Sequence, residues 1–204
     1  MLFGLLAVIL AYLIGGIPFG YLVVRLRTGD DVRGLGSGNI GATNVWRTTG
    51  RLLGLATLLL DVAKGYFAVW LAARLTNADV GWMCAAAGAV VLGHAFPVFL
   101  KFQGGKAVAS FVGVALYLTP LPLLAVMILF VVTVAVTRYI SLGSIIGAGL
   151  YWLAVYLIQH PPVEVMVLAV LAGAFIIWRH KGNIQRLRAG NENVFNLKAK
   201  GARA

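Results

Sequence analysis

The 204-residue chain has few acidic residues and almost no cysteine. It contains six Asp and Glu residues and one cysteine, Cys84, which lies in an apolar stretch and cannot form an internal disulfide. A metal site needs several carboxylate, histidine or cysteine ligands close together, and the sequence holds no H-E-x-x-H motif and no such cluster. A G-x-S-x-G nucleophile elbow and a Walker A motif are also missing. We therefore expect neither a metal nor a cofactor.

Charge of either sign is rare, whereas apolar residues are abundant. Charged residues make up 11% of the chain and hydrophobic residues 61%, with a mean hydropathy of +0.92. This composition predicts an all-α, polytopic membrane helix bundle rather than a soluble domain. The formal net charge of +11 does not indicate nucleic-acid binding, because the basic residues stand at the ends of apolar segments and not on one helix face. Beside a membrane, such charge favours anionic lipid headgroups and anionic substrates.

Seven apolar segments are candidate membrane spans, given that a helix needs about 20 apolar residues to cross a bilayer. They cover residues 2–24, 52–75, 80–100, 107–118, 121–136, 141–158 and 163–178. The fourth is too short to span unaided, so it and the fifth form either a short hairpin or one interrupted span. The first lacks a basic n-region and is interpreted as a permanent span, not a cleaved signal. We expect one integral-membrane domain over residues 1–204, in which 193–204 form a loose cytoplasmic tail.

The positions of the basic residues favour seven spans. All but two of the 17 Lys and Arg residues fall in the connections that follow the first, third, fifth and seventh segments. With seven spans these connections share one side of the membrane, whereas six would scatter the charges. The positive-inside rule then predicts an external N-terminus and a cytoplasmic C-terminus.

One polar stretch, residues 34–47, stands out in this apolar chain. Glycines such as Gly36 and Gly38 allow positive φ, and successive amide N–H groups in such a loop can form an anion-binding nest. Further donors are the side chains of Ser37, Asn39, Thr43, Asn44 and Arg47. We interpret the stretch as a phosphate cradle. The alternative is a flexible linker, but linkers rarely carry so many different hydrogen-bonding groups.

A second candidate anion site precedes the fourth apolar segment. Gly104 and Gly105 stand just before a predicted helix, with Lys106 beside them. We expect free N–H groups here, at the positive end of a helix dipole.

Two further polar connections are predicted on the same side, at residues 138–144 and 180–192. Their polar side chains include Arg138, Ser141, Ser144, His180 and Asn183. His180 is either an interfacial residue or a group that accepts a proton or donates a hydrogen bond.

Two charges lie inside a predicted span. Asp61 and Lys64 are three residues apart and so share a helix face. Because charges within a membrane usually face a partner or a cavity, they either pair structurally, which we favour, or reach the functional site.

Cations and neutral donors dominate these polar connections, and carboxylates are nearly absent from them. The ligand is therefore expected to be an anion beside a membrane: a phosphorylated small molecule, a lipid phosphate or both. An alternative function is a transporter or flippase for a phosphorylated solute or lipid, but the polar groups lie on one face and no inverted repeat is visible. A lipid-binding scaffold would explain the charge but not four separate donor-rich connections.

Four motifs carry a resemblance to a known family. Residues 36–47, GSGNIGATNVWR, resemble the G-S-G-N-x-G-A-T-N-x-x-R motif of the bacterial acyl-phosphate-dependent glycerol-3-phosphate acyltransferases. Residues 93–106 resemble their G-H-x-x-P and F-x-G-G-K-G motifs, and residues 180–192 resemble H-x-x-N-I-x-R-L-x-x-G-x-E. The turn at 138–144 is similar to the polar turn between their later spans. One departure is Ala107, which replaces the glycine that commonly follows the motif lysine and is expected to tighten the phosphate pocket.

The resemblance implies transfer of a fatty acyl group from acyl phosphate to the sn-1 hydroxyl of glycerol-3-phosphate, which gives lysophosphatidic acid and phosphate for phospholipid biosynthesis. The implied partners are these two substrates, membrane lipid and a soluble enzyme that forms acyl phosphate. The implied location is the bacterial inner membrane, with the active site toward the cytoplasm and no role for nucleic acid.

The resemblance also leads to a hypothesis for the site. Lys106 and the Gly104 and Gly105 amides would hold one phosphate. The other substrate would be positioned by Arg47, Ser37, His180 and Asn183. The catalytic candidates are His180, Asn183, Lys106, Arg47 and Ser37. The substrate- and phosphate-binding candidates are Gly36, Gly38, Asn39, Thr43, Asn44, Gly104, Gly105, Ser141 and Ser144. Because no Ser-His-Asp set is available, we expect direct attack without an acyl-enzyme. The hydroxyl proton would pass to His180 or, as the cationic surroundings favour, to the donor phosphate.

Overall fold

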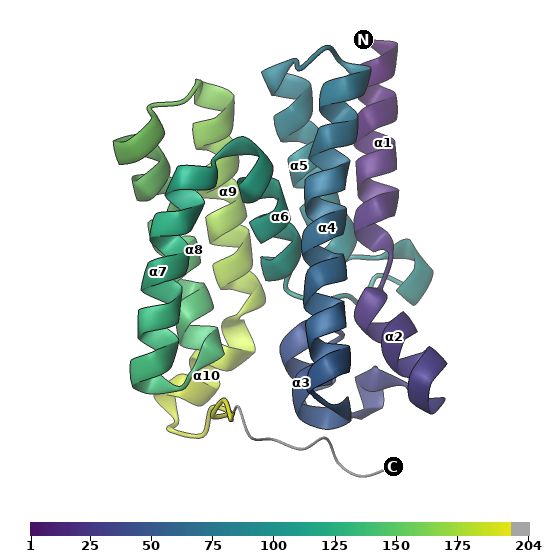
Figure 1. Cartoon of the computed structure of the whole chain (residues 1–204), viewed down its shortest axis with the longest axis vertical. Helices are drawn as coiled ribbons and strands as arrows, with labels where there is room; N and C mark the ends of the chain where they lie inside the picture. Colours follow the sequence, from purple (N-terminus) through teal and green to yellow (C-terminus); the bar gives the residue numbers. More distant parts are fainter. Residues whose placement is uncertain (197–204) are drawn as a thin grey trace. The chain divides into compact units, whose positions relative to one another are not determined.

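The computed structural model describes residues 1–196, which are helical and contain no strand (Figure 1). The predicted all-α class is therefore confirmed for the described part of the chain. The helices are α1 (Leu2–Gly16), α2 (Phe19–Thr28), η1 (Val32–Gly34), α3 (Ala42–Thr49), α4 (Arg51–Leu75), α5 (Val80–Ala95), η2 (Val98–Leu100), α6 (Val108–Leu118), α7 (Pro120–Thr137), α8 (Ile140–Gln159), α9 (Val163–Arg179) and α10 (Lys181–Arg188). They divide into two compact units, at residues 1–114 and 115–196.

Each of the seven predicted apolar segments contains a helix. Five helical stretches are long and apolar enough to cross a membrane, namely Leu2–Thr28, Arg51–Leu75, Val80–Leu100, Pro120–Thr137 and Ile140–Gln159. Helices α9 and α10, bent by 57° at a short break, make a sixth if they count as one span. Helix α6 has 11 residues and is short, as predicted. The protein is thus a multi-pass membrane protein with five or six candidate spans.

The first predicted segment is broken into α1 and α2. The break falls at Ile17 and Pro18, between the two helices. Proline has no backbone N–H and disfavours the helical conformation of the residue before it. The carbonyl of Ile17, which the break removes from the helical ladder, instead accepts a hydrogen bond of 2.8 Å from Lys64 Nζ on α4.

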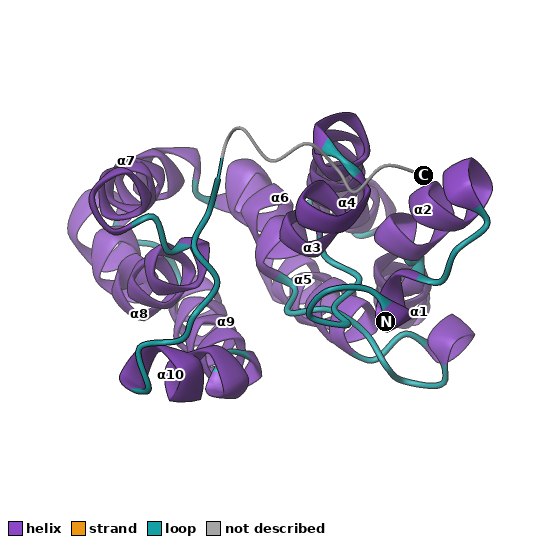
Figure 2. Ribbon diagram, turned by 90° about the horizontal axis from the view of Figure 1, so that it is seen from below, coloured by secondary structure: helices purple, strands orange, loops and turns teal. Residues whose placement is uncertain are grey.

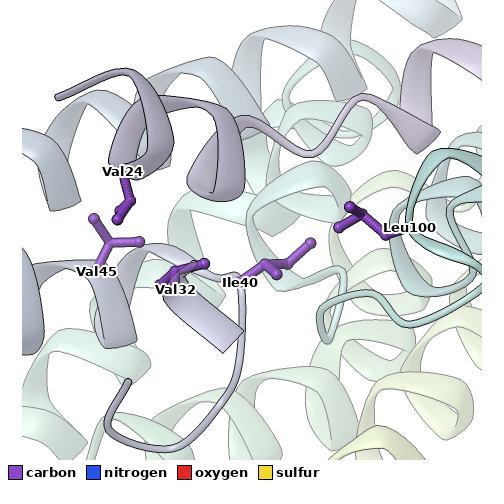
Figure 3. Close-up of a cluster of buried hydrophobic side chains, with 5 residues drawn as sticks. All are labelled: Val24, Val32, Ile40, Val45 and Leu100. Atoms are coloured by element: carbon purple, nitrogen blue, oxygen red, sulfur yellow. The ribbon is translucent and has the colours of Figure 1, made fainter. Parts of the chain in front are cut away.

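In the first unit, helices α1, α4 and α5 pack through small residues that let backbones approach. A Cβ at Gly93 would collide with the backbone carbonyl oxygen of Tyr12 and fall 3.0 Å from the backbone nitrogen of Gly16, so only glycine fits this crossing of α5 and α1. The short helices α2 and α3 pack on α4. Between them lies a buried apolar cluster, shown in Figure 3, of Val24, Val32, Ile40, Val45 and Leu100.

In the second unit, helix α8 packs against both α7 and α9. Figure 2, which looks along these helices, shows the three side by side. The buried hydroxyls of Thr119 and Tyr151 share a hydrogen bond. Of the predicted tail, residues 197–204 lie outside the described residues. Within the part that is described, the Phe195 N–H donates to the Arg138 carbonyl at 2.7 Å, so this portion contacts the turn between α7 and α8.

Candidate active site

The glycine-rich stretch of the first unit folds as a loop that leads into a short helix. Gly36 and Gly38 adopt φ values of 58° and 69°, so the prediction of positive φ at these two positions is confirmed. A Cβ at Gly36 would also lie 2.7 Å from the Thr48 methyl carbon. Sequence reasoning did not foresee helix α3, which carries Thr43, Asn44 and Arg47. Helix propensity gave little signal there, because Asn and Thr favour turns and caps.

The side chain of Asn44 organises this loop from inside. It is 3% exposed, and its Oδ1 accepts from the Ser37 N–H at 3.0 Å, the Ser37 hydroxyl at 3.1 Å and Arg47 Nη2 at 3.2 Å. Its Nδ2 donates to the carbonyls of Leu35 at 3.0 Å and Asn39 at 2.9 Å. Asn44 therefore holds Ser37 and Arg47 next to each other, and its amide is occupied by protein groups on both sides.

The predicted nest of anion-binding amides is wrong at three positions of the loop. The Ser37 N–H bonds to Asn44, the Gly38 N–H donates to the Leu35 carbonyl at 3.0 Å, and the Gly41 N–H donates to Asn39 Oδ1 at 2.8 Å. The physical reason is that this tight loop places carbonyl and amide oxygens of the chain within reach of its own N–H groups. The groups that remain for a ligand are side chains, and those of Ser37 and Thr43 are exposed.

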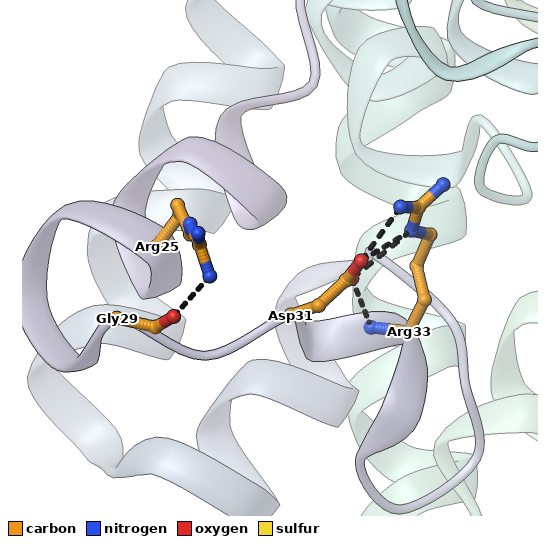
Figure 4. A network of polar contacts seen from close by, with 4 residues as sticks. All are labelled: Arg25, Gly29, Asp31 and Arg33. Carbon is orange, nitrogen blue, oxygen red and sulfur yellow. Dashed lines mark hydrogen bonds and ion pairs between the residues drawn. The ribbon is translucent and has the colours of Figure 1, made fainter.

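A bidentate ion pair fixes the entry to the loop (Figure 4). Arg33 donates from Nε to Asp31 Oδ1 at 3.0 Å and from Nη2 to Asp31 Oδ2 at 2.6 Å. The hydrogen bonds from Arg33 lower the pKa of the Asp31 carboxyl from 3.8 to about 2. On the other side, Arg25 donates to the Gly29 carbonyl that ends α2. Asp31 is thus an ionised structural partner and a poor candidate for a catalytic base.

The second candidate anion site, which we call the Lys106 loop (residues 104–107), differs from its prediction. The Gly104 N–H donates to the Ala95 carbonyl at 3.2 Å, and the Gly105 N–H donates to the His94 carbonyl at 3.1 Å. The expectation that these two amides are free for a phosphate is therefore wrong. The carbonyls in the last turn of α5 have no partner within their helix, and the loop supplies it. The half-buried Lys106 remains as the cation of this loop.

Ala107 closes the Lys106 loop in a backbone conformation that favours glycine. Its φ is 62°, and its side chain is fully buried. An L-residue with a Cβ is strained in this left-handed region, by about 1–2 kcal/mol. This conformation gives a physical reason for the glycine that the family motif has at this position.

The two polar segments of the first unit rest on one apolar cluster. Ile40 and Val45 come from the glycine-rich stretch, whereas Leu100 comes from the turn that leads to the Lys106 loop (Figure 3). All three side chains are buried. Their shared cluster fixes one polar segment relative to the other within this unit.

His180 and Asn183 belong to the second unit, where both are buried. His180 Nδ1 lies 2.7 Å from the Ile176 carbonyl oxygen, so Nδ1 carries a hydrogen and Nε2 is the accepting atom of the neutral ring. Asn183 Nδ2 donates to Glu192 Oε1 at 2.8 Å, and Arg186 Nε donates to Glu192 Oε2 at 2.8 Å. The site candidates did not include Glu192, although it ends the 180–192 motif.

Ser141 and Ser144, also in the second unit, differ in their partners. The Ser144 hydroxyl donates to the Ile140 carbonyl one turn earlier, at 3.0 Å. The Ser141 hydroxyl is buried and has no hydrogen-bond partner among the described residues. A buried hydroxyl without a partner is costly, so Ser141 is the better candidate ligand of the two.

The fold and its polar segments define a multi-pass helical membrane protein rich in cations and hydrogen-bond donors. The family model for glycerol-3-phosphate acyltransferase matches residues 5–190. The chain is 48% identical to the glycerol-3-phosphate acyltransferase of Geobacter sulfurreducens, with 96% of this chain and 99% of the relative covered. It is 46% identical to that of Desulforamulus reducens, with 89% and 90% covered.

A solved structure of a glycerol 3-phosphate acyltransferase also matches this chain. The integral membrane glycerol 3-phosphate acyltransferase PlsY, in its glycerol 3-phosphate form, superposes with a TM-score of 0.89 at 38% identity, with 95% of this chain and 96% of that chain covered. Its lysophosphatidic acid form gives a TM-score of 0.86. The chain belongs to the glycerol-3-phosphate acyltransferase family and is an acyltransferase, which confirms the resemblance drawn from the motifs.

Proposed function

We propose that this protein transfers a fatty acyl group from acyl phosphate to the sn-1 hydroxyl of glycerol-3-phosphate. The products are lysophosphatidic acid and phosphate, the first step of a phospholipid synthesis. Support comes from the family and from the related structures, which are described with glycerol 3-phosphate and with lysophosphatidic acid. A transporter or flippase is disfavoured by the same family membership.

One observation carries the proposal: arginines pair with two of the three carboxylates beside the polar segments. Asp31 is paired with Arg33, and Glu192 is bound by Arg186 and Asn183. The third, the neighbouring Asp30, is exposed. Apart from Asp30, the polar segments therefore present mainly cations and neutral donors, a set that binds phosphates.

A donor with a good leaving group suits such a site. Acyl phosphate is a mixed anhydride, so the enzyme mainly positions two anions and stabilises developing charge. The sn-1 hydroxyl oxygen attacks the acyl carbonyl carbon, a new C–O ester bond forms, and the bond from that carbon to the phosphate oxygen breaks. The phosphate leaves with the electron pair. Lys106, Arg47 and Ser37 would bind the phosphate groups, and the hydroxyl proton passes to His180 or to the departing phosphate.

The tautomer of His180 narrows its role. A neutral ring with its hydrogen on Nδ1, bonded to the Ile176 carbonyl, presents Nε2 as an acceptor. Neutral His180 is then fit to accept the hydroxyl proton, whereas only the protonated ring donates from Nε2 to a phosphate. Asn183, held by Glu192, would orient the same substrate.

We also propose the topology and location of the enzyme. Seven spans, with α6 as a short one, place the basic connections on one side, which gives an external N-terminus and a cytoplasmic C-terminus. The active site would then face the cytoplasm of a bacterial inner membrane, where a soluble enzyme that forms acyl phosphate has access.

The test uses purified protein in lipid with palmitoyl phosphate and glycerol-3-phosphate, and without CoA. Release of phosphate and formation of lysophosphatidic acid are followed together. We expect equal amounts of both products. Arg47→Ala and Lys106→Ala should lose most of the activity. The control Arg74→Ala should change the activity little, because this guanidinium packs on Trp70 in the last turns of α4. A folded wild-type protein that forms product from palmitoyl-CoA but not from palmitoyl phosphate would refute the donor assignment.

Two His180 variants separate proton removal from hydrogen bonding. Asn places an amide near the position of Nδ1 and keeps the bond to Ile176, whereas Gln places its amide near Nε2. If His180 is the base, both variants lose activity, by about 10²–10⁴-fold. Retention of activity in His180→Gln would assign hydrogen bonding to the residue and proton transfer to the phosphate.

A further inference from the structure

A buried polar cluster in the first unit has no role in the reaction described so far. It consists of Asp61 and Lys64 on α4, His94 on α5 and Ser110 on α6, all less than 5% exposed. Lys64 Nζ lies 2.8 Å from Asp61 Oδ1, so the predicted pairing is confirmed. His94 Nδ1 lies 3.0 Å from Ser110 Oγ and 3.7 Å from Asp61 Oδ1.

The far edge of the His94 ring lies against the Lys106 loop. A Cβ built on Gly105 would collide with the imidazole of His94. It would lie 3.0 Å from Cδ2 and 3.3 Å from Cε1 of that ring, and Nε2 would be the nearest atom. The His94 carbonyl also accepts the Gly105 N–H at 3.1 Å. His94 therefore contacts this loop twice, through its backbone and through its ring, one residue before Lys106.

The polar cluster fixes the orientation of that ring. Ser110 and Asp61 both approach Nδ1, and Lys64 neutralises the carboxylate. Ser110 also lies in the first turn of α6, which follows directly from the loop. The loop is thus held at its start by His94 and at its end by a residue that is bonded to His94.

We propose that His94, oriented by Asp61 and Ser110, is a positioning residue that sets the place of Lys106 for the acyl-transfer reaction. The inference rests on the proposed function, in which Lys106 binds a substrate phosphate. A cluster that served only the helix packing would have no need of a ring edge against Gly105. A site cation displaced by about 1 Å can cost about 10²-fold in rate, so a small change in the ring should be measurable.

His94→Asn tests the ring while it keeps a polar group at the Nδ1 position. We expect kcat/KM to fall by about 10- to 100-fold, with a rise in the KM of the same substrate whose KM rises in Lys106→Ala. In the Lys106→Ala background, the same substitution should have little further effect, because both act on one interaction. The matched control is His160→Asn, which removes an exposed histidine that packs on Tyr156.

A second variant approaches the same contact from the loop. Gly105→Ala puts a methyl group against the imidazole and should lower kcat/KM in the wild-type background. In His94→Asn the ring edge is gone, so the methyl has room and Gly105→Ala should restore part of the activity. Thermal unfolding in detergent checks that each variant is folded, and Gly105→Ala leaves the whole polar cluster in place.

The outcomes separate the two proposals. A wild-type protein that forms no lysophosphatidic acid from acyl phosphate would overturn the proposed function. Active wild type, with a raised KM in Lys106→Ala but unchanged kinetics in His94→Asn, would overturn the positioning role alone. The positioning role would also be overturned if Gly105→Ala lowered kcat/KM equally in the wild-type and His94→Asn backgrounds. The two residues would then act independently.

Discussion

Helix α4 and the first turn of α6 approach so closely that one methyl group should separate them. A Cβ at Gly65 would lie 2.8 Å from the carbonyl carbon of Ser110 and 3.1 Å from its Cα. Both are backbone atoms, so no side chain can rotate away. Gly88 on α5 provides a matched control, because a Cβ there meets nothing within 4 Å. We predict that Gly65→Ala destabilises the protein, whereas Gly88→Ala does not.

The expected magnitude follows from the distances. Carbon atoms pack at about 3.5–4.0 Å, so the 2.8 Å contact at Gly65 requires a shift of the backbone by about 0.7 Å or more. Such overpacking typically costs about 1–3 kcal/mol, whereas replacing a helical glycine with alanine gains up to about 1 kcal/mol when space permits. Gly65→Ala should therefore lower stability by about 1–2 kcal/mol, and Gly88→Ala should leave it unchanged or raise it.

Thermal unfolding of both variants in one detergent measures the difference. For a chain of this size, about 2 kcal/mol corresponds to a fall in Tm of roughly 4–8 °C. Activity adds a second readout, because the shift at Gly65 moves Ser110 and with it the His94 ring. Equal Tm values and equal kcat/KM for the two variants would show that the close approach of α4 and α6 is not present in the folded protein.

Three further predictions concern charge and backbone strain. Lys64→Met leaves the carboxylate of Asp61 buried without its cation and should cost about 3–5 kcal/mol, whereas adding Asp61→Leu should recover much of this loss; unfolding of both proteins in detergent compares them. Ala107→Gly should leave the free energy of unfolding nearly unchanged, because relief of about 1–2 kcal/mol of backbone strain offsets the lost burial of the methyl group and the extra entropy of the unfolded chain. Ala107→Val should clearly lower the free energy of unfolding, because the larger side chain has no room at this buried position. Because the folded pKa of Asp31 is lowered to about 2, its pair with Arg33 should contribute stability above pH 4 that is lost as the pH falls toward 2; the pH dependence of Tm should flatten there in Asp31→Asn.

The sequence predicted the helices well, because membrane spans leave a long apolar signal. The predicted boundaries at residues 52–75 and 80–100 agree closely with α4 and with α5 plus η2. The break at Pro18 was not predicted, because the apolar run favours one span over residues 2–24, although a proline after two glycines and an isoleucine stands there. What the pattern did not show is the short helix α3, whose polar residues carry no apolar period.

Hydrogen bonds made by the loops themselves account for the errors at the site, because their partners follow no helix or strand period. The glycines at 104 and 105 have the composition of an anion-binding loop, yet their N–H groups bond to carbonyls at the end of α5. No local pattern reveals those acceptors, since they depend on how the chain turns back after Pro97. The hydrogen bonds of Asn44, a predicted binding residue, were equally hidden in the sequence, since both sides of its amide form hydrogen bonds within its own loop.

The polar residues of the first unit thus divide by burial into two kinds. Ser37 is exposed, and Arg47 and Lys106 are half-buried, as expected of groups that meet a phosphate. Asn44 and His94, which contact these residues or the loop that carries them, are almost fully buried. A buried amide or imidazole needs its partners and so can adopt few orientations. Under the proposed function, in which Ser37, Arg47 and Lys106 bind the substrates, Asn44 and His94 would set the positions of these side chains. Substitutions at the two buried residues would then test the proposed reaction through positioning alone.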